Sequence, residues 1–198
     1  MLVLFFQTVI NAGSTNKNSF TIGIDGFIGQ FDSDNKTAGV LAHGGYDFFF
    51  NRINFLSIEP KIGVGYFGRP QAEGLNPTLS SGYNIACFAA CISPKLHLSL
   101  NPDDTALIFI ENEFSLLNAH ARIEDQGQSN TRVSRGLLFY YTLKLGLTFK
   151  LSDNNKLAIW VGGSTLNFDT LLNNHIPKGQ KRYSGESSPF AIGVNFHL

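Results

Sequence analysis

Strict alternation of apolar and polar residues is the feature that most constrains how this chain folds. The clearest example is LLFYYTLKLGLTFKL, residues 137–151, in which Leu143, Leu145 and Leu147 alternate with small or polar residues. Successive side chains of a β-strand point to opposite faces, so a period of two predicts a strand with one apolar and one polar face. A helix needs a period near 3.6, and no segment shows a convincing one.

The same alternation recurs along the chain and predicts eight strands. The segments with this period are residues 19–31, 38–50, 55–67, 86–100, 106–117, 137–151, 156–164 and 190–198. Three connections, NRIN, NPDDT and SDNNK, are short and rich in turn-forming residues. They alternate along the chain with four connections at the other end of the strands, three of which are long. Tight turns at one end and long loops at the other are typical of an antiparallel up-and-down barrel. The last strand is then expected to pair with the first, near FTIGIDGF.

Composition indicates which face of the strands is outside. Charged residues make up 15% of the chain, against about 25% in typical soluble domains. The polar face also carries glycines such as Gly23, Gly63 and Gly146, which weaken a solvent-exposed strand but make room inside a crowded barrel. The sequence therefore predicts an all-β fold, an eight-stranded antiparallel up-and-down transmembrane β-barrel with its apolar face toward lipid. The alternative is a soluble lipocalin-like ligand-binding barrel with its apolar face inside.

Charged residues of both signs fall on the inward face, where an unpaired charge is costly. We expect them to form an interior polar network of Asp25, Asp47, Glu59, Lys61, Lys95, Glu111, Glu113, Lys144 and Lys150. Side chains fill an eight-stranded barrel, so this network is interpreted as structural and not as a wide pore. Cys87 and Cys91 would share one strand face about 13 Å apart, too far for a disulfide, and are predicted to be small interior thiols.

The N-terminal region differs from the rest. Residues 1–18 contain the apolar run MLVLFFQTVINAG, which is similar to the core of a secretory signal but lacks a positive start. We predict a signal-like segment or an N-terminal extension over residues 1–18 and the barrel over residues 19–198. No run approaches the roughly 18 apolar residues of a membrane helix.

The strand count, the alternation of long and short connections and the terminal FAIGVNFHL resemble one known class. They are similar to the eight-stranded outer-membrane barrels of Gram-negative bacteria, the OmpA/OmpX-like class, over residues 19–198. In that class the last strand usually ends on an aromatic residue that the assembly machinery reads; here Leu198 is last and Phe196 is in phase with it. The resemblance implies a place in the bacterial outer membrane. It implies as partners outer-membrane lipid and lipopolysaccharide, other outer-membrane proteins, and the barrel assembly machinery during biogenesis.

For function, the sequence favours a non-enzymatic barrel with a structural or interaction role. That role is membrane stabilisation, surface binding, or service as a subunit of a larger outer-membrane assembly. The net charge of zero gives no reason to expect a nucleic-acid partner, and no motif for a metal or cofactor is found. Basic residues gather in two of the long connections, where they are candidate surface contacts. They are Lys178, Lys181 and Arg182 in the last connection, with Tyr183 beside them as a further candidate, and Arg122, Arg132 and Arg135 in the third outer connection.

The alternative function is that of a lipid A-modifying enzyme. Lipid A deacylases use a Ser, a His two residues earlier and a Glu further on, and His97, Ser99 and Glu111 have a compatible spacing. However, the alternation places His97 and Ser99 inside the barrel, and the topology places them beside the tight turn NPDDT. Both positions are away from lipid A of the outer leaflet, so we assign no catalytic residues.

Overall fold

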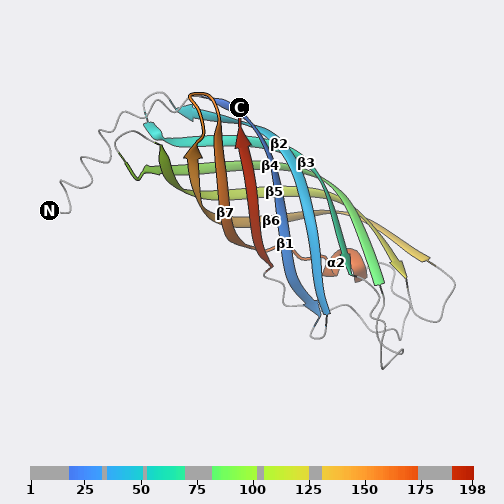
Figure 1. The fold of residues 1–198 in the computed structure, drawn as a ribbon. Helices are drawn as coiled ribbons and strands as arrows, with labels where there is room; N and C mark the ends of the chain where they lie inside the picture. The colour runs from blue at the N-terminus through green and yellow to red at the C-terminus, as the bar shows by residue number, and fades with distance from the viewer. Residues whose placement is uncertain are drawn as a thin grey trace.

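The structure, a computed structural model, describes residues 18–32, 35–50, 53–69, 82–101, 105–124, 131–173 and 189–198. Figure 1 shows strands that wind around one ring with a short helix near one end. The strands are β1 (Ser19–Asp32), β2 (Asn35–Phe50), β3 (Ile53–Arg69), β4 (Gly82–Ser99), β5 (Ala106–Glu124), β6 (Thr131–Lys150), β7 (Lys156–Ser164) and β8 (Phe190–His197). They form one closed antiparallel barrel in chain order, which confirms the predicted fold class.

The barrel closes between its first and last strands, as the sequence predicted. Residues Thr21–Ile28 of β1 pair with Phe190–His197 of β8. The amide of Leu198 continues the ladder by donating to the carbonyl oxygen of Phe20 at 2.8 Å. The edge of the last strand is therefore satisfied by the first, which is what an antiparallel sheet needs in a medium without water.

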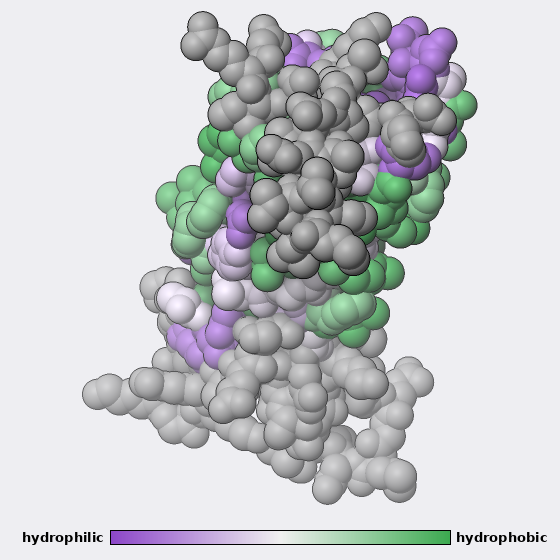
Figure 2. Space-filling model, turned by 90° about the vertical axis from the view of Figure 1, so that its left-hand side faces the viewer, coloured by the Kyte–Doolittle hydropathy of each residue, from purple (hydrophilic) through white to green (hydrophobic). Residues whose placement is uncertain are grey.

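The outer wall of the barrel is apolar. Alternate residues on every strand point outward, and large apolar side chains such as Ile22, Phe139 and Leu145 are 59%, 69% and 55% exposed. Figure 2 shows hydrophobic residues gathered around the middle of the barrel, with hydrophilic ones nearer its ends. An exposed apolar band of this kind suits a lipid environment and would be an aggregation surface in water. Among the described residues, no helix is long and apolar enough to span a membrane.

The strands differ in length, and here the structure corrects one expectation. β5 and β6 have 19 and 20 residues, whereas β7 and β8 have 9 and 8. The stretch 118–136, expected to be a long connection, is mostly strand, because β5 stays paired with β6 as far as Glu124 and Thr131. The alternation continues through this stretch, but the outward positions are now polar and the inward positions apolar. Ala121 and Ile123 are buried, whereas Arg122 between them is exposed.

The interior of the barrel contains two layers. Charged and polar side chains fill the part that lies between the apolar outer positions, and apolar side chains fill the end with the longer strands. Helix α2 (Asp169–Asn173) packs against β5 and β6 and belongs to this apolar layer. No helical period predicted α2, because five residues are too few to show one. The apolar layer includes Phe27, Phe67, Tyr83, Ile85, Ile123, Tyr140, Leu166, Phe168, Leu171 and Leu172.

Contacts within the apolar layer tie α2 and the residues before it to the wall. The Phe168 ring lies 5.0 Å from the Phe67 ring, and Phe67 lies 5.6 Å from Phe27. Leu171 and Leu172 are buried, and the Cδ1 atom of Leu171 lies over the backbone of Gly136 in β6. The segment thus closes the interior from the long-strand end.

One glycine shows how the wall makes room for a large interior residue. Gly193 of β8 is paired with Trp160 of β7, and the Trp160 indole lies directly over the Gly193 backbone. A methyl group at this glycine would overlap the indole ring. The glycine-rich polar face therefore has the packing role that the sequence suggested.

Candidate functional site

The buried ionic network begins with one row of the ladder. Lys95 of β4 pairs with Glu111 of β5, which in turn pairs with Lys144 of β6. All three side chains point into the barrel and are 3% or less exposed. Three neighbouring strands thus present charges of alternating sign at one level, which is the arrangement in which buried charges compensate one another.

Two lysines hold the central carboxylates together. The Lys61 Nζ lies 2.6 Å from Glu111 Oε1 and 2.5 Å from Glu113 Oε2. The Lys144 Nζ lies 2.7 Å from the same Glu113 Oε2 and 3.3 Å from Asp25 Oδ2. The ammonium of Lys144 also lies 4.2 Å from the centre of the Trp160 ring, within range of a cation–π contact.

The third lysine connects the remaining carboxylates. Lys95 forms an ion pair with Glu59, and its Nζ lies 3.5 Å from Glu111 Oε2 and 3.7 Å from Asp47 Oδ2. Thr21 Oγ1 donates a hydrogen bond to Glu59. Through these contacts the structure brings eight of the nine predicted network residues into one cluster.

Histidines lie beside two of the five carboxylates in this cluster. The Nε2 atom of His43 lies 3.1 Å from Asp25 Oδ1, and Nδ1 of His197 lies 4.0 Å from Asp47 Oδ2. Five carboxylates face three lysines in this cluster, and His43 shares a hydrogen bond with Asp25. His197 is beyond hydrogen-bond distance of Asp47, and its Nδ1 lies 3.3 Å from Ser19 Oγ. Neither histidine was among the predicted network residues.

Lys150 is the exception among the predicted network residues. Its side chain is 35% exposed and pairs with Asp153 in the β6–β7 turn at 2.8 Å. The alternation gives Lys150 the inward parity, but the barrel ends at this level and the side chain meets solvent. The expectation that Lys150 belongs to the interior network is therefore wrong.

The three residues of the alternative enzymatic hypothesis have separate partners. His97 Nε2 lies 2.9 Å from Ser57 Oγ, whereas Ser99 Oγ donates to the backbone oxygen of Asn101 at 2.6 Å. Glu111 is held by the network lysines. A serine nucleophile needs its histidine as a hydrogen-bonded base, and this arrangement does not provide that contact.

Metal and thiol chemistry find no support in the described residues. No group of three or more His, Cys, Asp or Glu side chains among them could hold a metal ion. Cys87 and Cys91 are buried free thiols, which confirms the predicted interior position. The predicted surface contacts Lys178, Lys181, Arg182 and Tyr183 lie outside the described residues, as do residues 1–17.

A basic patch lies on the outer wall near the long-strand end. Its members are His120 and Arg122 of β5 and Arg135 of β6, all exposed. His120 and Arg135 are directly paired, and a hollow of about 390 Å³ borders them. Arg132 has the opposite parity to Arg135 on β6, so its side chain lies on the inner side of the wall. Sequence analysis named these arginines but placed them in a loop, so it missed that two of them share one strand face.

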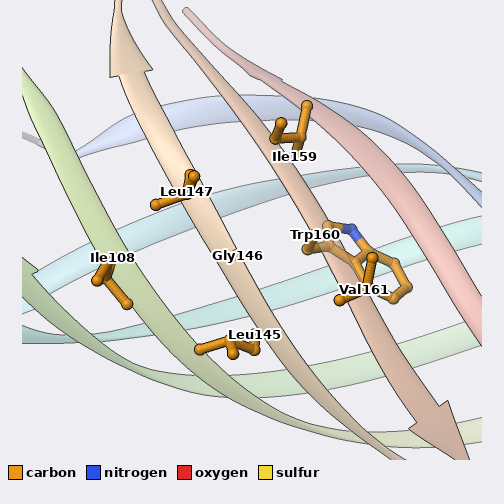
Figure 3. A pocket seen from close by; sticks show the side chains of 7 residues that line it. All are labelled: Ile108, Leu145, Gly146, Leu147, Ile159, Trp160 and Val161. Atoms are coloured by element: carbon orange, nitrogen blue, oxygen red, sulfur yellow. The ribbon is translucent and has the colours of Figure 1, made fainter.

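A second hollow lies lower on the wall, between β5, β6 and β7 (Figure 3). Ile108, Leu145, Leu147, Ile159 and Val161 surround Gly146 and Trp160 there. The hollow has a volume of about 340 Å³ and an almost wholly apolar lining. The hollow is part of the apolar band of the outer wall.

Comparisons with known proteins concern the fold. No known protein family and no curated protein matches the sequence. Among solved structures, the chain is similar to Neisserial surface protein A, with a TM-score of 0.51 and 14% identity over 92% of this chain and 99% of that one. It also aligns with Ail, the attachment invasion locus protein of Yersinia pestis (TM-score 0.49, 12% identity, covering 91% and 97%). A further match is the N-terminal β-barrel domain of Pseudomonas aeruginosa OprF (TM-score 0.38, 11% identity, covering 92% and 100%). The closed antiparallel ring and the likeness to the neisserial protein show that the chain has the fold of the eight-stranded outer-membrane β-barrels.

Proposed function

We propose that this protein is a non-enzymatic barrel of the bacterial outer membrane that acts through its outer surface and does not form a pore. Its role would be structural or interactive: stabilising the membrane, binding at the surface, or serving within a larger outer-membrane assembly. The observation that carries this proposal is the filled interior. An ionic layer and an apolar layer follow one another along the axis, and described side chains occupy both.

The two layers oppose permeation for different reasons. In the ionic layer, Glu111 and Lys144 are held by several partners each, so a passing ion would have to separate buried pairs. In the apolar layer, Phe168 and Leu171 are buried among other apolar side chains, which cannot replace the hydration shell of an ion. A solute would meet both obstacles in succession.

The outer surface supports an interaction role. The apolar band faces lipid, and above it the basic patch of His120, Arg122 and Arg135 is exposed. The similar neisserial protein is named as a surface protein, which agrees with a role at the surface. Lipid, lipopolysaccharide and other outer-membrane proteins are the partners that such a surface would meet.

A conductance measurement tests the central claim. Purified protein inserted into planar lipid bilayers should give no discrete conductance steps. Phe168→Ala combined with Leu171→Ala opens the apolar layer and should still conduct little, because the ionic layer remains. Steady ion conductance by the unaltered protein would overturn the proposal. Membrane fractionation, together with a gel mobility that changes on boiling, tests the outer-membrane location separately.

The enzymatic alternative has its own test. Ser99→Ala should leave the mass spectrum of lipid A from producing cells identical to that of cells making the unaltered protein. A change in acyl chain number that depends on Ser99 would establish the enzymatic function instead.

A further inference from the structure

We propose that His120, Arg122 and Arg135 bind the phosphorylated headgroup of a lipid in the surrounding outer leaflet. This inference rests on the outer-membrane location proposed above and names a partner for the outer surface. Four observations carry it: the height of the patch relative to the apolar band, the clustering of its basic side chains, the lack of a counterion among the described residues, and the hollow beside the patch.

The height of the patch follows from the length of the apolar band on β6. Outward residues of β6 are apolar at every second position from Phe149 to Leu137, with Leu137 68% exposed. Twelve residues of strand span about 40 Å, and a strand tilt of 35–45° reduces this to about 30 Å along the barrel axis. That length matches the hydrocarbon thickness of a bilayer, so the next outward residue, Arg135, lies at the level of the headgroups.

The basic side chains of the patch are close together. Directly paired residues of an antiparallel sheet have Cβ atoms about 5 Å apart, and this applies to His120 and Arg135. Arg122 is the next outward residue of β5, diagonal to Arg135 at about 7–8 Å. One phosphate group can therefore reach both guanidinium groups, whose planar donors match its oxygens in pairs.

The electrostatic surroundings leave the patch without a described counterion. None of the three side chains forms a hydrogen bond or ion pair with another described residue. The carboxylates of the network are buried on the other side of the wall, and Asp153 lies in a turn at the opposite end of the barrel. An anion from the membrane would supply a negative charge that the described side chains of this face do not provide.

The hollow gives the patch an amphipathic shape. It is lined by Ala86, Phe88, Asn118, His120 and Arg135, together with the wall residues Cys87 and Ala119. Phe88 is 51% exposed and is paired with Asn118, one outward position nearer the apolar band than the pair of Ala86 and His120. A ligand with an acyl chain below and a phosphate above fits this order of side chains. Free phosphate would use only the upper half, so the geometry favours a lipid.

The test compares binding of phosphorylated and dephosphorylated lipid A to the full chain in detergent micelles, by native mass spectrometry. The unaltered protein should prefer the phosphorylated form by about tenfold or more, as expected for one charge-assisted hydrogen bond. The triple variant His120→Gln/Arg122→Gln/Arg135→Gln should lose this preference. The matched control Lys150→Gln/Lys156→Gln removes two positive charges at the opposite end and should keep it.

Several outcomes would overturn the inference. They are an unchanged preference in the triple variant, an equal loss in the control, and displacement of lipid A by inorganic phosphate at similar concentration. An acidic protein can serve as a second probe. If the triple variant lost binding to that protein but kept the lipid preference, the inference would also be overturned, and the patch would instead have a protein partner. A change of gel mobility on boiling verifies that each variant is folded. If the protein fractionates with the outer membrane but shows no lipid preference, only this inference fails; if it does not fractionate there, the proposed function fails.

Discussion

The lower and upper parts of the β4–β6 wall have opposite polarity. In the lower part, which includes β5 residues 106–117, apolar side chains such as Ile110 point outward while Glu111 is buried. In the upper part, β5 residues 118–124, His120 and Arg122 point outward while Ile123 is buried. The exchange occurs within a single continuous strand that keeps its register with β6 throughout.

We interpret the exchange as the effect of two different media outside the barrel, in line with the proposed outer-membrane location. Where lipid lies outside, the outward positions must be apolar, and the polar residues left for the interior need partners of opposite charge. Where water and headgroups lie outside, the arrangement returns to that of a soluble protein, with Tyr83, Ile85 and Leu172 in an apolar core. The ionic layer and the apolar layer are therefore the interior counterparts of two outer environments.

The largest expected effect comes from removing a cation in the lower part. Lys144→Met leaves Glu111, Glu113 and Asp25 with one cation fewer and should lower the free energy of unfolding by about 3–5 kcal/mol. Urea unfolding in detergent micelles, followed by circular dichroism, measures the change. The double variant Lys144→Met/Glu113→Gln removes a negative charge as well and should recover part of the loss. A loss under 1 kcal/mol for Lys144→Met would contradict the account of the ionic layer.

A charge placed on the outer wall distinguishes the two parts directly. Leu145→Arg puts a cation into the apolar band and should cost about 2–4 kcal/mol, the usual cost near the bilayer midplane. Val133→Arg makes the same kind of change in the upper part, where the cost should be about 0–1 kcal/mol. Unfolding of both variants in lipid vesicles provides the comparison. Equal costs at the two positions would mean that the boundary of the apolar band is drawn in the wrong place.

The apolar layer should respond more moderately. Leu171→Ala leaves a cavity in the upper interior, and we expect a loss of about 2 kcal/mol, the low end for buried leucines, because the mouth of the barrel can partly collapse. Thr170 is exposed on the same helix, so Thr170→Ala is the control and should change stability little. If both substitutions had the same effect, α2 would not contribute to the core through its leucines.

The smallest effect is expected at Lys150. Its partner Asp153 is 96% exposed, and a surface ion pair of this kind contributes at most about 1 kcal/mol. Lys150→Gln should thus leave the urea midpoint almost unchanged, and raising the salt concentration should abolish the remaining difference. A loss comparable to that of Lys144→Met would return Lys150 to the interior network.

Much of the architecture could be predicted because the period of two is a direct consequence of strand geometry. It identified the strands, the closure of β8 on β1, and the burial of Glu59 and Lys95 from residue order alone. It could not identify which lysine contacts which carboxylate, because these partners come from strands far apart in the sequence. Lys61 and Glu113 are one such pair.

Two further features escaped the sequence for identifiable reasons. The change of polarity at Asn118, where outward positions become polar, was interpreted as the start of a loop. The reason is that an apolar outward face was expected to continue along the whole strand. Lys150 was read as interior because parity gives direction but not depth, and the strand there has reached the end of the barrel. Both errors come from treating the outside medium as uniform along a strand.

The shortness of β8 has a consequence for how the ring comes apart. β8 has eight residues, and its pairings with β1 and β7 extend over no more than that length. Releasing β8 breaks fewer backbone hydrogen bonds than releasing any other strand. The barrel should therefore open first by separation of β8 from its neighbours. In a hydrogen–deuterium exchange experiment, the backbone amides of Ile192 and Val194 in β8 should exchange before the paired amides of the long β5–β6 hairpin. The shortest strand thus sets the resistance of the closed barrel to opening.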